Sequence, residues 1–330
     1  MTAPLPEIAV VVPMRDASDT VAETIGSIAA QTVDRAAIEV LVVDDGSIDG
    51  GGQIADDALR RGRLTGRLLR TAGALGPSAA RNLGWRAARA PWIQFLDADD
   101  LVGPEKLALQ LPAARASAPD TCAVHSAWAR LEPAGGRWVP SSVVVDPTVG
   151  TEPLADLLRA DNFLHTGCAL FRRSALERVA GFDTSLRLVE DVDLLMRLAL
   201  DGGRFLRVHA AGPLFWYRQR PGSLSRRDEG AFVDACLRNT RRAEVAWRAD
   251  GPLTASRREV LAGLYGQAAR HYAERDRSRF EELVSHIGDL DPGFVPSGPE
   301  GLRRLSQVVG YRAAERFAVR YRRARRLLQR

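Results

Sequence analysis

Two aspartates separated by one residue, Asp97 and Asp99, follow the apolar run Trp92–Leu96. Alternate residues of an extended segment leave the backbone on the same side, so these two carboxylates can share one hard cation through their oxygens. A divalent metal that bridges a diphosphate would need this arrangement. A solvated turn rich in aspartate is the alternative, and it is the commoner explanation of an isolated Asp-x-Asp.

A second pair of acids, Asp44 and Asp45, closes the apolar run Val40–Val43 and is followed by Gly46 and Ser47. A carboxylate at this position can accept a hydrogen bond from the N3–H group of uracil or thymine, whereas adenine has no such donor. An ordinary turn built from Asp, Gly and Ser is the alternative.

A third acidic group, Glu190 and Asp191, opens a segment whose apolar residues recur with helical spacing. The helix macrodipole alone favours acids in a first turn. The chemical interpretation is a general base, because a carboxylate in a partly desolvated cleft can take the proton from an attacking hydroxyl group. The residues themselves leave both interpretations open.

The elements that must position these acids are short apolar runs that alternate with amphipathic stretches, which is the pattern of a parallel α/β sheet. Ile8–Val12, Val40–Val43 and Trp92–Leu96 predict three strands, and Thr20 with Glu23 predicts a capping box before the first helix. The carboxyl ends of strands in an open α/β sheet face the ligand crevice. Acids at two of these ends are therefore placed for binding or chemistry.

The later part of the chain predicts two further strands and then only helices. Cys122–Leu131 and Trp138–Val145 have strand patterns, and amphipathic helices follow from about Asp228. We therefore predict an α/β domain over 1–225, with a Rossmann-like, mostly parallel central sheet flanked by helices. Residues 226–330 are predicted to form a helical C-terminal region.

Composition and cysteine use restrict the class of protein. The 330 residues are 45% hydrophobic and 26% charged, close to the averages of folded globular proteins. No stretch approaches the ~18–20 consecutive apolar residues of a membrane-spanning helix, and no basic region precedes the first apolar run, so we expect no signal peptide. Three widely separated cysteines without metal-ligand spacing predict reduced thiols in a cytoplasmic protein and no zinc site.

The net charge of +5 is unevenly distributed. Residues 301–330 contain ten arginines and one acid, Glu315, so this segment carries +9 and subtraction leaves −4 for the rest. We therefore expect no nucleic-acid partner. The last predicted helix is a solvated face packed on the rest of the chain, a membrane-surface anchor through 311–330, or a polyanion-binding tail. The need to bury Phe317 and Tyr321 favours the first.

Several separated motifs in one order over residues 6–225 identify a resemblance. They are VVVPMRDASDTVAETIGSIAAQT, IEVLVVDDGS, GPSAARNLGWRAARAPWIQFLDADD, GCALFRRSALERVAGFDTSL, EDVDLLMRLALDGG and YRQRPGSLS. The chain resembles family 2 glycosyltransferases with the GT-A fold. The resemblance implies an inverting enzyme that moves a sugar from a nucleotide diphosphate donor, UDP or dTDP, to an acceptor hydroxyl with Mn²⁺ or Mg²⁺. Processive members carry Gln-x-x-Arg-Trp and membrane helices, which are missing here, so we expect single additions.

The resemblance also implies roles for individual residues. Asp191 would be the catalytic base, Glu190 would orient the acceptor, and Asp99 with Asp97 would hold the metal. The donor would be bound by Pro13, Asp44, Asp45, Arg81, Asp97, Arg218, Ser223 and Ser225, the last three in a loop with Tyr217 that closes on the diphosphate. Many relatives place a histidine metal ligand in that loop, where this chain has Gln219.

The acceptor is not specified by any motif. His165, beside Asn162, is a candidate for contacting it, and packing is an equal alternative for this histidine. A glycan, a lipid-linked molecule, a small molecule or a peptide would each provide a hydroxyl group. The oligomeric state is not indicated either.

Two other functions fit parts of the pattern. A degenerate sugar-nucleotide or partner-binding module would lose the base or the metal acid, and this chain keeps Asp99 and Asp191. A nucleotidyltransferase usually has a glycine-rich, lysine-bearing loop after the first strand, where this chain has Pro13-Met14-Arg15-Asp16. A nicotinamide dehydrogenase would need G-x-G-x-x-G there, which is absent.

Overall fold

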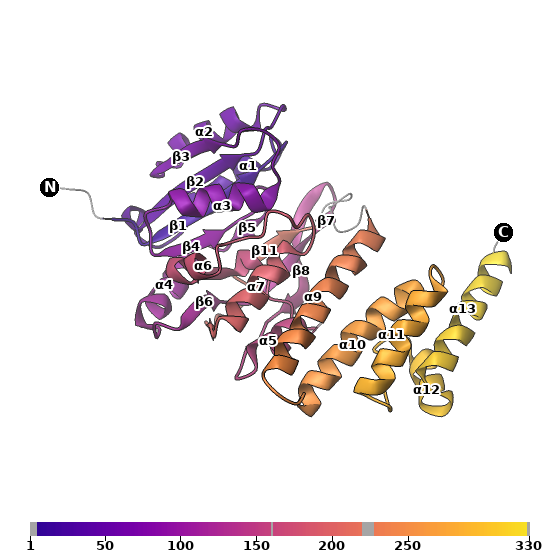
Figure 1. Cartoon of the computed structure of the whole chain (residues 1–330). Coiled ribbons are helices and arrows are strands. Elements are labelled where there is room, and N and C mark those ends of the chain that lie inside the picture. Colours follow the sequence, from indigo (N-terminus) through magenta and orange to yellow (C-terminus); the bar gives the residue numbers. More distant parts are fainter. Residues whose placement is uncertain (1–4, 160, 220–227, 329–330) are drawn as a thin grey trace. The chain divides into compact units, whose positions relative to one another are not determined.

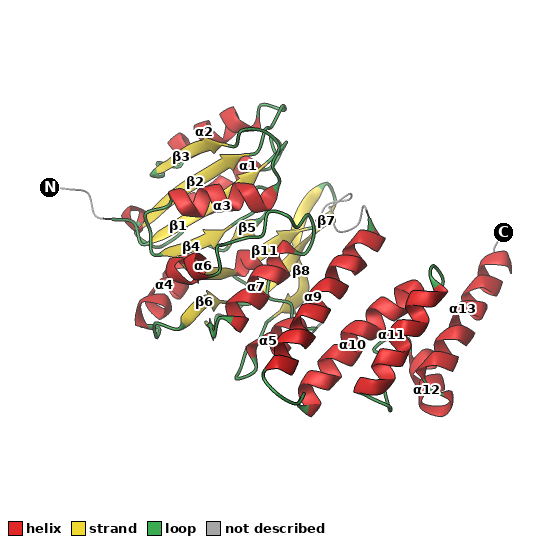
Figure 2. Ribbon diagram, viewed as in Figure 1, coloured by secondary structure: helices red, strands yellow, loops and turns green. Residues whose placement is uncertain are grey.

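The computed structural model describes residues 5–159, 161–219 and 228–328 (Figures 1 and 2). The chain folds as two compact units, Met1–Ser223 and Leu224–Arg330. The domain boundary predicted at residue 225 therefore lies in a segment outside the described residues.

A seven-stranded sheet forms the centre of the first unit, in the order β10-β6-β9-β4-β1-β2-β3. Six strands share one direction and β9 is antiparallel to both of its neighbours, which confirms the predicted mostly parallel sheet. All residues of β1 and β2 are buried, as expected of central strands with helices on both faces (Figure 2). The strands are β1 (Ile8–Met14), β2 (Ile38–Asp44), β3 (Gly66–Arg70), β4 (Trp92–Phe95), β6 (Thr121–His125), β9 (Ala169–Arg172) and β10 (Arg204–Arg207).

The helices of this unit connect the strands and carry several of the candidate residues. They are α1 (Val21–Ala29), α2 (Gly51–Arg61), α3 (Pro77–Ala87), α4 (Lys106–Ala116), α5 (Pro153–Leu158), α6 (Arg173–Arg178) and α7 (Glu190–Leu200). Helix α3 packs closely on β1 and β2 at Gly84, where an added Cβ would lie 2.3 Å from Val11 Cγ1. Glycine at this position lets the helix approach the sheet.

A second sheet of four strands has the order β5-β11-β7-β8. Its strands are β5 (Leu101–Val102), β7 (Trp128–Ala134), β8 (Arg137–Val145) and β11 (Phe215–Arg218). The single strand predicted over Cys122–Leu131 is therefore wrong, because the chain leaves the first sheet after β6 and enters the second at β7. Tyr217 and Arg218 were predicted to lie in a loop, and they lie in β11 instead.

One further strand was not predicted, and one local prediction is wrong. Strand β3 was missed because it lies at the edge of its sheet with mostly exposed or half-buried side chains, so it has no continuous apolar run. Thr20 does precede α1, but its hydroxyl makes no capping bond. The carboxylate of Glu23 instead accepts a hydrogen bond from Arg218 Nη2 at 2.6 Å, and a charged partner outweighs a neutral capping bond.

The only lysine in the sequence, Lys106, lies fully buried at the start of α4. Its ammonium group donates to the side-chain oxygens of Gln94 and Gln110. Both glutamines then donate to backbone carbonyls of the 3₁₀ turn Thr166–Cys168, so this network connects α4 and β4 to that turn. Burial lowers the pKa of Lys106 to about 7.

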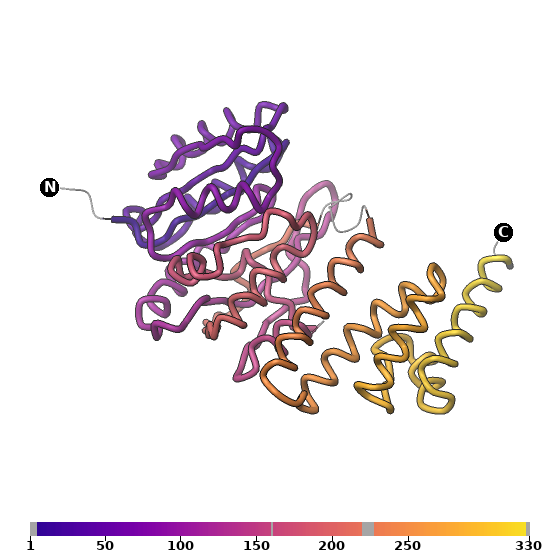
Figure 3. The backbone as a smooth tube through the Cα atoms, in the orientation of Figure 1, coloured from indigo at the N-terminus to yellow at the C-terminus, as the bar shows by residue number. Residues whose placement is uncertain are grey.

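The second unit is entirely helical within the described residues, and its chain path is clear in Figure 3. Asp228, Thr254 and Asp276 each accept a backbone hydrogen bond in the first turn of the helix that follows. No helix of the described residues is long and apolar enough to cross a membrane. The helices are α9 (Glu229–Ala249), α10 (Ala255–Tyr272), α11 (Arg277–Leu290), α12 (Glu300–Val309) and α13 (Tyr311–Leu328).

We expect Gly84→Ala to lower the free energy of unfolding by about 1–3 kcal/mol, because the new methyl group overlaps the stiff side chain of Val11. Urea unfolding followed by tryptophan fluorescence measures this, since five of the six tryptophans lie in the first unit. Gly26→Ala is the control. Gly26 has open space around its Cβ position in α1, so this change should raise stability by up to about 1 kcal/mol. Equal midpoints for the two variants would contradict the close approach of α3.

Candidate active site

One guanidinium group connects two of the predicted acidic motifs. Arg81 Nη2 lies 2.7 Å from Asp97 Oδ1, and Arg81 Nη1 lies 2.9 Å from Glu190 Oε1. The Arg81 side chain is only 7% exposed and lies over the ring of Phe182. Arg81 comes from α3, Asp97 follows β4 and Glu190 begins α7, so one cation holds three elements together.

The charges of this bridge stabilise one another. Burial by itself would lower the pKa of Arg81, but the neighbouring Asp97 and Glu190 carboxylates outweigh it and raise that pKa. Burial would likewise raise the pKa of Asp97, and Arg81 holds it below its ordinary value. Both partners are therefore ionised at neutral pH, as a buried ion pair requires.

Asp191 has the opposite electrostatic environment. Burial raises the pKa of its carboxyl group to about 6, and the adjacent negative charge of Glu190 acts in the same direction. The hydrogen bond that Asp191 Oδ1 accepts from Val192 N at 2.8 Å offsets part of the shift. Asp191 is therefore a carboxylate that can exchange a proton near neutral pH, which is what a general base needs.

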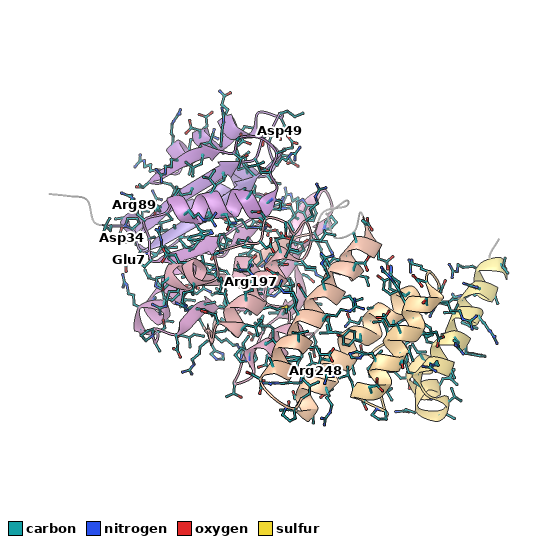
Figure 4. The ribbon with its side chains drawn as sticks, viewed as in Figure 1. Glu7, Asp34, Asp49, Arg89, Arg197 and Arg248 are labelled. Carbon is teal, nitrogen blue, oxygen red and sulfur yellow. The ribbon has the colours of Figure 1, made fainter. Side chains whose placement is uncertain are left out.

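Backbone strain and an ion pair fix the start of α7. Val189, a buried β-branched residue, has a φ of +57°, a conformation that such residues rarely adopt. Further along the helix, Arg197 lies 2.7 Å from Asp193 and donates to the carbonyl of Val179 (Figure 4). Strain of this kind persists only where the surroundings hold it, so the direction of Glu190 and Asp191 is set by their neighbours.

The turn after β4 contains a third acid that sequence reasoning left without a role. Asp100 is fully buried, and its Oδ1 accepts a hydrogen bond from Arg218 N at 2.8 Å. Its Oδ2 has no hydrogen-bond partner among the described residues. Burial raises the pKa of Asp100 well above its ordinary value, and the charges of Asp99 and Asp97 add to this. The sequence could have indicated a role for Asp100, because this residue is the last acid of the Asp-Ala-Asp-Asp motif.

Asp45 holds the segment that leads into α3. Its buried carboxylate accepts hydrogen bonds from Thr71 Oγ1 and from the backbone N–H groups of Leu75 and Gly76, at 2.7–2.9 Å. These bonds fix the position from which α3 presents Arg81.

Asp44 is buried beside it at the end of β2. It accepts a hydrogen bond from Ser47 N at 2.8 Å and lies 3.8 Å from the guanidinium of Arg70. Pro13, on the neighbouring strand β1, is buried in register with Val43. The acids after β2 thus form the turn, and each carboxylate keeps lone pairs for further donors.

Aromatic rings lie close to the acids. The ring centre of His165 is 4.8 Å from that of Phe215 and 5.0 Å from that of Tyr217. Burial lowers the pKa of His165 to about 4, against the effect of Asp97, so its imidazole is neutral. Burial, reinforced by Asp100 and the other acids nearby, raises the pKa of Tyr217 to about 12. Tyr217 therefore presents a protonated hydroxyl group.

Arg218 and the two serines complete the predicted donor residues. The buried Arg218 guanidinium pairs with Glu23 and lies over the ring of Trp138. Ser223 and Ser225 lie outside the described residues.

Asn162, predicted beside the acceptor, and Asn82, on α3, both support the backbone. Asn82 bonds the backbone of Phe182 through both its amide N–H and its carbonyl oxygen, which ties α3 to the segment before α7. Asn162 uses its amide to hold Thr148 and Asp156.

Comparison with known sequences places these motifs among relatives. Residues 9–180 match the family model described as glycosyl transferase family 2. The succinoglycan biosynthesis protein ExoO of Rhizobium meliloti is 31% identical over 71% of this chain and 66% of its own length. For ExoU of the same organism the identity is 30%, over 64% of this chain and 63% of ExoU. The chain thus spans less than two thirds of these two relatives.

Solved structures share the fold at low sequence identity. S. aureus TarS 1–349 in complex with UDP-GlcNAc has a TM-score of 0.64 at 18% identity, covering 96% of this chain and 92% of that one. The mannosyltransferase PcManGT from Pyrobaculum calidifontis, in complex with GDP-Man and Mn²⁺, has a TM-score of 0.50 at 20% identity, with 96% and 87% coverage.

We expect Arg81→Gln to lower the free energy of unfolding by about 2–4 kcal/mol at pH 7, because it leaves two partly buried carboxylates without their cation. Urea unfolding of both proteins measures the difference. The folded pKa of Asp97 lies below the value of about 4 that this carboxyl has in the unfolded chain. Its contribution to the free energy of unfolding is therefore fully present above about pH 4, and it is lost as the pH falls through the folded pKa.

The matched control is Arg60→Gln, which removes an exposed guanidinium paired with Asp56 on α2. This change should cost less than about 1 kcal/mol. An equal loss in both variants, or a difference that does not shrink in acid, would contradict the role given to the Arg81 bridge.

Proposed function

Because the chain belongs to glycosyl transferase family 2 and has the GT-A fold, we propose that it is an inverting glycosyltransferase for UDP- or dTDP-sugar donors. The relatives' names and the family model identify the class of enzyme as a glycosyltransferase. The arrangement around Arg81 supports the proposed mechanism and donor class. It brings the Asp97 motif to the start of α7, where Asp191 has a raised pKa.

The donor would lie across the carboxyl ends of β1, β2 and β4. Asp44 and Asp45 would receive the N3–H of the base or a ribose hydroxyl, and Pro13 would form a wall of the base pocket. The TarS fragment was crystallised with UDP and with UDP-GlcNAc, which supports a uridine nucleotide. Arg218 would act at the diphosphate, and its Nη2 donates to Glu23 in this structure.

Asp97 and Asp99 suit a hard divalent cation. Both are half-buried, and Arg81 contacts only one oxygen of Asp97. No group of three or more His, Cys, Asp or Glu side chains that could hold a metal occurs in the described ranges. Mg²⁺ is typically held by one or two carboxylates together with substrate phosphates and water, so two acids fit this site. The PcManGT complex with Mn²⁺ supports a divalent ion, Mn²⁺ or Mg²⁺, which would offset the charge of the departing diphosphate.

The chemical step needs one base from the chain. Asp191 would take the proton of the acceptor hydroxyl as its oxygen forms a bond to the anomeric carbon. The bond from that carbon to the diphosphate oxygen breaks with its electron pair on the nucleotide, so a single displacement inverts the centre. Glu190 is held by Arg81 and would orient the acceptor rather than accept its proton. Asp191 afterwards releases the proton to water.

The acceptor side would be lined by His165 and Tyr217. Nδ1 of the neutral His165 imidazole accepts a hydrogen bond from Gly167 N at 3.0 Å, so its Nε2–H can donate to a sugar hydroxyl oxygen, and the Tyr217 hydroxyl can donate as well. Asn162 would act by holding the neighbouring segment through Thr148. The succinoglycan biosynthesis relatives favour a glycan or lipid-linked glycan acceptor over a peptide or small molecule.

We expect one nucleotide sugar of a UDP, dTDP and GDP panel to bind with Mn²⁺ and to lose affinity in EDTA. Asp99→Ala should weaken binding with Mn²⁺ to the level seen in EDTA, because it removes a carboxylate from the proposed metal site. Titration calorimetry measures both. Metal-independent binding, or full affinity in the variant, would remove the metal from the proposal. Absence of binding by every donor would favour a degenerate module on this fold.

Asp191→Asn should bind the same donor normally and lower kcat for donor hydrolysis by about 10²–10⁴-fold, because an amide cannot accept the proton. In the wild type, kcat should fall as the pH drops below about 6, since the protonated carboxyl is inactive. The control Asp201→Asn, at an exposed ion pair near the other end of α7, should keep both properties. Unchanged turnover in Asp191→Asn would assign the base elsewhere.

A further inference from the structure

Helix α13 has two chemically different faces. Tyr311, Ala314, Glu315 and Val319 are buried in the second unit. Arginines on this side pair with acids of the same unit, since Arg322 lies 2.7 Å from Glu274 and 2.8 Å from Glu315.

Three more arginines of the helix are neutralised in the same way. Arg312 and Arg316 pair with Glu281, and Arg326 pairs with Glu274. About half of the positive charge of α13 therefore serves to hold the helix in its own unit.

The opposite face carries exposed aromatic side chains. Phe317 is 62% exposed and Tyr321 is 61% exposed, so the predicted burial of these two residues is wrong. With Ala313 and Ala324, which are also exposed, they follow one another at steps of four and three along one stripe. We call these four residues the aromatic stripe.

Two exposed arginines flank the aromatic stripe. Helical spacing places Arg320 on one side of it and Arg325 on the other, and neither forms an ion pair within the part of the chain that the structure describes. Of the three arginines of α13 that form no ion pair among the described residues, two therefore flank the exposed aromatic rings, and the third, Arg323, donates to the backbone carbonyl of Glu274.

We propose that α13 docks on an anionic lipid surface, with Phe317 and Tyr321 in the interface and Arg320 and Arg325 at the lipid phosphates. Aromatic rings favour the boundary between headgroups and acyl chains, and arginines beside an apolar face are typical of helices that lie in the membrane plane. The helix has 18 residues, or about 27 Å, and can lie flat on the surface. We favour a membrane over a nucleic acid, because a lipid interface can take up the aromatic rings while its phosphates pair with the flanking arginines.

Sedimentation of the full chain with lipid vesicles tests this proposal. We expect binding to vesicles of phosphatidylcholine and phosphatidylglycerol, little binding to phosphatidylcholine alone, and weaker binding in 1 M NaCl, where charges are screened. The variant Arg320→Gln/Arg325→Gln should partition about fivefold more weakly for each arginine removed. Phe317→Ser/Tyr321→Ser should weaken partitioning at least about tenfold.

The matched control is Val245→Ser, which removes an apolar side chain that is 69% exposed on α9 of the same unit. It should bind vesicles like the wild type. All variants should hydrolyse the donor at the wild-type rate, so failure of this proposal is separate from failure of the proposed function. Equal binding to neutral vesicles, unaltered binding by the stripe variants, or binding to single-stranded nucleic acid without vesicle binding would overturn it.

Discussion

The site depends on one guanidinium between two carboxylates. Arg81 can reach Asp97 and Glu190 together only because its two terminal nitrogens point in fixed, divergent directions, which a lysine ammonium could not reproduce with two partners held at these positions. This contact in turn requires that α3 lie close to the sheet, as Gly84 permits. The geometry of the acids therefore depends on the packing of the core, because a movement of α3 away from the sheet would also separate Arg81 from the two carboxylates.

Neighbouring acids in this site have their pKa values moved in opposite directions. The pKa of Asp97 is lowered because Arg81 contacts it directly, and that of Asp191 is raised by burial and, to a smaller extent, by the negative charge of Glu190. One permanent charge suits the binding of a cation, and one exchangeable proton suits acid–base chemistry. Two aspartates of one site thus differ in pKa because their surroundings differ.

Much of the fold could be predicted because its central strands are buried on both faces and therefore appear in the sequence as continuous apolar runs. The acids after β2 and β4 could be placed at the carboxyl ends of these strands, because each directly follows an apolar run. The pairing of Arg81 with Glu190 could not, because the local pattern does not reveal which side chains meet across a hundred residues. The capping role predicted for Glu23 is wrong for the same reason, because its partner Arg218 is distant in sequence and lies in a strand of the second sheet. The burial expected for Phe317 failed because α13 buries its other face.

The buried position of Lys106 has a consequence for the whole surface. Because this is the only lysine, every exposed side-chain cation that does not titrate near neutral pH is an arginine. Guanidinium groups keep their charge up to about pH 12, so the basic surface of the second unit stays positive in alkaline buffers where lysine-rich proteins lose charge. Reagents that acylate side-chain amines would find no accessible target on the native protein. A lysine introduced on any exposed helix would therefore be a unique side-chain attachment point for a probe.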